Sequence, residues 1–118
     1  MNLDDYVKGW IIGDFLPNII NSKDIEVGVK YYKSGDKECR HVHNFVDEYT
    51  IVLTGCVKMN NIIYRNKEII FTPKGISTDF ECLEDSVNLV LKTPSIPSDK
   101  TIIDQWKNLI LKILDIWD

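Results

Sequence analysis

The sequence lacks the features that mark several common classes of protein. Its three cysteines are odd in number and form no C-x-x-C pair, so we expect reduced thiols in a cytoplasmic protein. No apolar run approaches the roughly 18 residues that span a bilayer. Residues 1–5 are acidic and lack the positive and apolar regions of a signal peptide. We therefore expect no association with a membrane.

Basic patches and nucleotide-binding motifs are also missing. The chain has 14 Lys and Arg against 18 Asp and Glu, a net charge of −4, and the basic residues are scattered. Phosphate recognition in nucleic acids draws on clustered Lys and Arg, so we expect no nucleic-acid partner. The sequence contains no G-x-G-x-x-G, P-loop, G-x-S-x-G or H-E-x-x-H motif. The commonest nucleotide-binding and hydrolase families are thereby excluded.

What is present is a single small domain that alternates strand and turn signals. The chain has 118 residues, of which 44% are hydrophobic and 27% charged, as in soluble globular proteins. Residues 1–24 form a leader that we expect to cover one edge of a sheet. Asn60 and Asn61 are typical of a hairpin turn. Short strands are predicted over 25–32, 40–43, 48–54, 57–59, 62–64, 68–71, 78–82 and 87–92.

The last part of the chain changes to a helical pattern. After the Pro- and Ser-rich residues 93–98, Thr101 and Asp104 resemble a capping box. A helix is predicted from about 101 to 117, with one strongly apolar face. The chain thus divides into a barrel with its leader, residues 1–98, and a C-terminal helix, residues 99–118. We expect that helix to pack on the barrel or on a second copy in a homodimer.

Both histidines of the chain fall in one short stretch. His41 and His43 are two residues apart, so on a strand their side chains share a face. Glu48 follows after a short connection, so a neighbouring strand can bring its carboxylate back beside the two histidines. Neutral imidazole and carboxylate are good ligands for a divalent metal. The alternative is a pair of hydrogen-bonded interior histidines in a barrel without metal.

This stretch resembles the first cupin motif, G-x5-H-x-H-x4-E-x6-G. Gly35, His41, His43, Glu48 and Gly55 all stand at the spacing of that family. The resemblance implies an all-β fold, an antiparallel double-sheet barrel or jelly roll. It also implies an interior divalent transition metal such as iron, manganese, zinc, nickel or copper.

The second cupin motif, G-x5-P-x-G-x2-H-x3-N, is half present. Pro73 and Gly75 match, whereas Lys67, Thr78 and Cys82 stand where the family has Gly, its metal-binding His and Asn. Thr78 can hydrogen-bond a water on the metal but is a poor ligand. Cys82, or Asp79 if the strand slips by one residue, would be the substitutes.

Three functions are compatible with these residues. The leading one is a metal-dependent enzyme, an isomerase, lyase or dioxygenase, that acts on a small polar metabolite with anionic or sugar-like groups. In it Lys30, Tyr32 and Thr78 are candidates for substrate binding. The second is a metal-free nucleotide-sugar isomerase or epimerase, with His41 and His43 as acid and base tuned by Glu48. The third is a non-enzymatic sensor or binding module.

Overall fold

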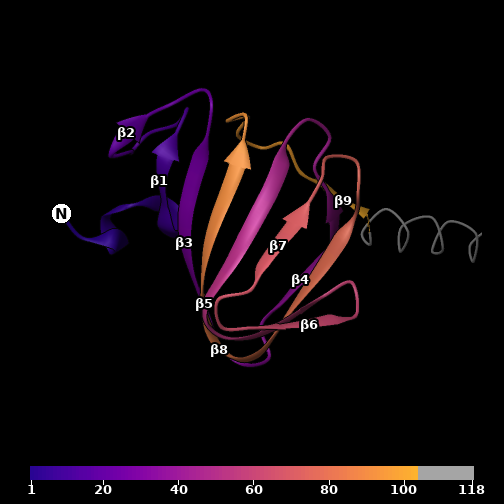
Figure 1. Cartoon of the computed structure of the whole chain (residues 1–118). Helices are drawn as coiled ribbons and strands as arrows, with labels where there is room; N and C mark the ends of the chain where they lie inside the picture. The colour runs from indigo at the N-terminus through magenta and orange to yellow at the C-terminus, as the bar shows by residue number, and fades with distance from the viewer. Residues whose placement is uncertain (104–118) are drawn as a thin grey trace, which may run out of the picture.

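The structure, a computed structural model, describes residues 1–103 and consists almost entirely of β-strands (Figure 1). Two short 3₁₀ turns, Leu3–Asp5 and Val7–Gly9, precede the first strand. The strands are β1 (Trp10–Gly13), β2 (Ile20–Asn21), β3 (Glu26–Tyr32), β4 (Lys37–Val42), β5 (Asp47–Met59), β6 (Ile62–Arg65), β7 (Ile69–Thr72), β8 (Thr78–Thr93) and β9 (Thr101–Ile102).

Two long strands, β5 and β8, pair with each other along most of their length and tie two sheets together. The first sheet has the order β2-β1-β3-β8-β5-β7 and uses the second half of β8 with the first half of β5. The second sheet has the order β9-β4-β8-β5-β6 and uses the other halves. Figure 1 shows the two long strands passing from one sheet to the other. The predicted all-β jelly roll is confirmed.

The bend in this ribbon lies at Gly55. Its φ of +106° favours glycine, and a Cβ there would lie 2.2 Å from Ser86 Oγ and 2.4 Å from the Asp85 carbonyl oxygen. The pairing of β5 with β8 shifts register around this point, as it does at a β-bulge. The predicted strand end at Gly55 is therefore wrong: the glycine bends the strand without ending it. Residues 78–82 and 87–92 likewise belong to one strand, β8.

The inner face of the first sheet carries one polar row, and its next inner rows include the buried Val90, Ile70 and Val52, whereas its outer face is apolar. Register places Glu26, Lys92, Glu48 and Thr72 side by side in one inner row. The next positions along the same strands point outward. Two outer rows consist of Val27, Leu91, Tyr49 and Phe71, and of Val29, Leu89, Ile51 and Ile69.

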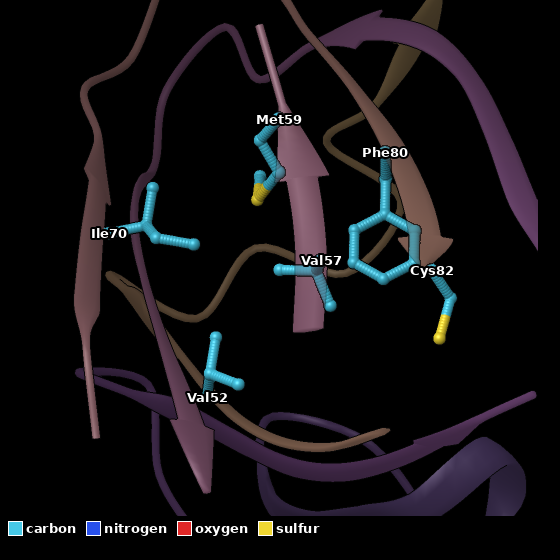
Figure 2. Packing of buried hydrophobic residues seen from close by; sticks show 6 residues of the cluster. All are labelled: Val52, Val57, Met59, Ile70, Phe80 and Cys82. Atoms are coloured by element: carbon cyan, nitrogen blue, oxygen red, sulfur yellow. The ribbon is translucent and has the colours of Figure 1, made fainter. Parts of the chain in front are cut away.

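The apolar core lies between the two sheets. Val57 and Phe80 are buried on the neighbouring strands β5 and β8, and the Tyr32 ring centroid lies 4.4 Å from that of Phe80. Figure 2 shows the side chains of the cluster turned toward one another: Val52, Val57, Met59, Ile70, Phe80 and Cys82. Cys82 is thus a buried core residue.

The N-terminal leader covers an edge of the first sheet, as predicted. Strand β1 pairs antiparallel with β3 and places Trp10 opposite Gly28. A Cβ on Gly28 would lie 2.7 Å from the Trp10 ring. The absence of a side chain at Gly28 therefore lets the indole lie against the sheet.

The C-terminal prediction is wrong at its start. Thr101 and Ile102 form β9, which pairs antiparallel with Val42 and His41 of β4. The open edge of β4 offers backbone hydrogen bonds, and the β-branched residues of this segment suit a strand better than a helix turn. The rest of the predicted helix, residues 104–118, lies outside the described residues. Among residues 1–103 no helix is long and apolar enough to cross a membrane.

Candidate metal site and cavity

Three side chains converge inside the barrel. His41 comes from β4, His43 follows directly after that strand, and Glu48 comes from the start of β5. Their ligand atoms all lie within 4.8 Å of one another. The three residues are 4%, 3% and 8% exposed. The two-residue spacing of the histidines thus aims both imidazoles inward, as strand parity requires.

Backbone carbonyls fix the orientation of both imidazole rings. His41 Nδ1 lies 3.0 Å from the Cys39 carbonyl oxygen, and His43 Nδ1 lies 2.5 Å from that of Asp99. Because a carbonyl only accepts, each Nδ1 carries the proton and each Nε2 keeps a free lone pair. This is the arrangement that orients histidines as metal ligands.

The Nε2 atom of His43 has no hydrogen-bond partner among the described residues, although it is fully buried. Glu48 Oε1 lies 3.7 Å from it. A buried polar atom without a partner is costly and calls for an explanation. A cation between the imidazole and the carboxylate would satisfy both groups.

The protonation states also suit a cation. Burial lowers the pKa of His41 and of His43, which favours the neutral imidazole. Burial raises the pKa of the Glu48 carboxyl, against the opposing attraction of Lys92 and His41. A divalent ion would stabilise the ionised carboxylate. Two neutral imidazoles and one carboxylate therefore fit a divalent transition metal.

The three residues open into a cavity of about 460 Å³. Its apolar wall is formed by Met59, Phe80 and Val90, next to the core. Apart from Trp10, its remaining lining is polar and includes the predicted substrate residues Lys30 and Tyr32. The Tyr32 hydroxyl donates a hydrogen bond of 3.0 Å to Glu38 Oε1.

The third predicted substrate residue, Thr78, lies beside the site without facing the cavity. It pairs with His41 across β4 and β8 and is 1% exposed. Its hydroxyl donates to the Asp79 carbonyl oxygen at 2.8 Å, and it is not among the described residues that line the cavity. Asp79 points away and forms an ion pair with Arg40 at 3.4 Å. Register therefore favours neither Asp79 nor the core residue Cys82 as a further ligand.

Sequence reasoning missed Asp99, which holds the loop of His43. Its carboxylate accepts hydrogen bonds from the backbone N–H groups of Asn44, Phe45 and Val46, and its carbonyl accepts from His43. No local pattern links residues more than fifty positions apart.

Several cavity residues were missed for the same reason. Lys92, Asn88 and Trp10 all line the cavity. Strand parity puts Lys92 and Asn88 on one face, but no signal in the sequence shows that this face turns toward the histidines.

The comparisons with known proteins bear on the fold. No family model and no curated protein matches the chain. Solved structures do match, among them a cupin-2 domain protein from Shewanella frigidimarina, at 20% identity and TM-score 0.54, covering 59% of this chain and 71% of that one. A Klebsiella pneumoniae protein with a double-stranded β-helix domain matches at 16% identity and TM-score 0.63, covering 86% and 94%.

An enzyme also appears among these structures. The DMSP lyase DddQ from Ruegeria pomeroyi matches at 17% identity and TM-score 0.65, over 83% of this chain. The chain spans about half of DddQ, 53% of its length. These likenesses concern the fold, and together with the strand order they show that the chain has the double-stranded β-helix fold of the small cupins.

Proposed function

We propose that this protein is a metal-dependent enzyme that acts on a small polar metabolite with anionic or sugar-like groups. The observation that carries the proposal is the set of three buried ligand atoms within 4.8 Å, together with the unpartnered Nε2 of His43. The likeness to the DMSP lyase DddQ supports a lyase as one reaction class, alongside an isomerase or a dioxygenase.

The residues of the chain have separate tasks in this proposal. His41, His43 and Glu48 would hold the metal, which supplies Lewis-acid polarisation of a substrate oxygen when bound. Tyr32 and Lys30 face the cavity from β3 and bind polar groups of the substrate. The apolar wall of Met59, Phe80 and Val90 limits the water around the reacting atoms.

Metal analysis tests the proposal directly. Wild-type protein purified without added metal, then offered manganese, iron, nickel or zinc, is expected to retain about one divalent ion per chain. His41→Ala and His43→Ala should lose the ion and keep the fold, since the core lies elsewhere. Thr78→Val is the matched control, because it removes a buried hydroxyl beside His41 and should retain the ion. Equal retention in all four proteins would refute the site.

The same geometry supports one alternative, a metal-free acid–base pair. His43 Nε2 and Glu48 Oε1 are 3.7 Å apart, close enough for the carboxylate to tune the imidazole. In this alternative a histidine moves a proton on a sugar-like substrate, as in an isomerase or epimerase. Wild-type protein with no affinity for any of the four metals would favour it over the metal enzyme.

A further inference from the structure

The cavity carries a concentration of positive charge that the composition of the chain does not suggest. Four lysines, here called the lysine cluster, line it in a chain of net charge −4: Lys8, Lys30, Lys92 and Lys100. Among residues 1–103, none of the four forms an ion pair with a carboxylate. Within the described part of the chain, Glu38 acts on Lys30, and Glu48 and Glu26 act on Lys92, only at longer range than an ion-pair contact.

The carboxylates that line the same cavity are engaged elsewhere. Glu48 lies against His43, and Glu38 accepts the hydrogen bond of Tyr32. The carboxylate of Asp99 accepts three backbone N–H groups of the His43 loop. These contacts hold the negative charges in place, so the lysine cluster stays available to a ligand.

Trp10 brings two of these lysines to one place. The indole lies on Gly28, and the ammonium groups of Lys92 and Lys30 lie 4.7 Å and 5.0 Å from its ring centroid. An aromatic ring attracts such cations and holds them at its face. Lys30 also donates a hydrogen bond of 2.6 Å to the backbone oxygen of Lys8. Both half-buried lysines are thus positioned rather than free to extend into solvent.

A second, independent feature of the cavity also indicates a ligand. Asn88 is 1% exposed, and its Oδ1 has no hydrogen-bond partner among the described residues. It pairs with Lys30 across β3 and β8 and lines the same cavity. A buried amide oxygen of this kind is satisfied by a ligand or an ordered water.

The charges of the cluster also act on one another. Burial, together with Lys92, Lys8 and Lys100, lowers the pKa of Lys30, against the opposing effect of Glu38. A bound anion would relieve this repulsion. Lys92 pairs with Glu48 on the neighbouring strand, so an anion at Lys92 lies close to the metal ligands.

We propose that the cavity binds an anionic oxygen group, a carboxylate or a phosphate ester, between Lys30 and Lys92 beside Trp10. Asn88 contacts a polar group of the same small molecule. The inference rests on the proposed function only in calling this ligand the substrate; the anion site itself needs no metal.

Isothermal titration calorimetry of the full chain at fixed ionic strength tests the proposal, with inorganic phosphate and succinate as probes and uncharged succinamide for comparison. Lys30→Met and Lys92→Met should each weaken anion binding about tenfold or more, since each removes a charged hydrogen-bond donor. Lys92→Arg should keep much of the affinity. Lys74→Met is the matched control, because Lys74 is exposed and lies outside the cavity lining, and it should bind as the wild type does.

The two anions distinguish a carboxylate from a phosphate ligand, because the anion that binds more tightly indicates which group the natural ligand carries. The proposal is overturned if the wild-type protein binds neither anion or binds succinamide as tightly as the anions. It is also overturned if both Met variants keep the full affinity of the wild type for the anions. Metal content measured on the same samples separates failure of the anion site from failure of the proposed function. Metal retention without lysine-dependent anion binding overturns only the anion site. Lysine-dependent anion binding without metal retention overturns only the metal enzyme.

Discussion

Replacing Glu48 by glutamine should change stability in opposite directions without and with metal. In the metal-free protein the buried carboxylate is poorly solvated, which is why burial raises its pKa. Glutamine has the same shape and no charge. Lys92 already offsets part of the cost, so we expect Glu48→Gln to stabilise the metal-free protein at neutral pH by about 1 kcal/mol.

With metal the sign reverses. At a free metal concentration 100 times the Kd, binding stabilises the wild-type fold by about 2.7 kcal/mol. If the loss of one of three ligands weakens binding by about 100-fold, the same metal concentration equals the new Kd. The stabilisation then falls to about 0.4 kcal/mol. The metal-dependent stabilisation that Glu48→Gln loses is therefore larger than the stability that it gains in the metal-free protein.

Urea denaturation with chelator and with added manganese or nickel measures both effects. Glu38→Gln is the matched control, because Glu38 lines the same cavity but lies outside the three-residue cluster. Its variant can still accept the Tyr32 hydrogen bond and should keep the metal-dependent stabilisation. The reasoning is refuted if Glu48→Gln gains as much from metal as the wild type, or if it is less stable than the wild type in chelator.

Three further outcomes are expected. Burial raises the pKa of Glu26, while Lys92 and a hydrogen bond from Ser95 oppose this shift. The Glu26 carboxyl therefore stabilises the fold at pH values below its pKa in the unfolded chain. That contribution is lost as the pH rises through its pKa in the folded protein. The stability of Glu26→Gln relative to wild type should therefore grow from pH 4 to neutral pH; urea denaturation across that range showing a constant difference would contradict it. Gly28→Ala should cost about 1–3 kcal/mol, because its Cβ meets the Trp10 ring; a urea midpoint equal to wild type would disprove the contact. The chain should form a homodimer through the outer face of the first sheet, and Phe71→Glu should yield monomers in light scattering; wild-type protein that is already monomeric at tens of micromolar would exclude it.

The site could be predicted from the sequence because its information is local. Strand parity alone aims His41 and His43 at one face, and Glu48 follows within a few residues. The hairpin at Asn60 and Asn61 was also predicted, and both residues have the positive φ that such a turn requires.

The errors arise where distant segments decide the structure. Thr101 and Ile102 carry a helical pattern with the residues that follow, but the edge of β4 captures them as β9. Gly55 is a strong turn signal, yet the paired strand β8 carries β5 through it. The lysine cluster could not be foreseen either, since Lys92 and Trp10 meet only through the register of β3 with its neighbours on both sides.

One polar row on the inner face of the first sheet explains how the barrel holds several charges near its centre. An antiparallel sheet usually turns its apolar face inward and its polar face to water, but here the inner row contains Glu26, Lys92 and Glu48. This row lies at one side of the apolar core, to which the same sheet contributes Val52 and Ile70 and the second sheet contributes Val57 and Phe80. The polar row and the apolar core meet at the cavity, where Met59 and Phe80 belong both to the core cluster and to the cavity wall. Changes in the polar inner row should alter ligand binding without opening the apolar core, whereas the exposed side chains of the outer rows, Tyr49, Phe71 and Ile69, gain stability only when an apolar surface covers them.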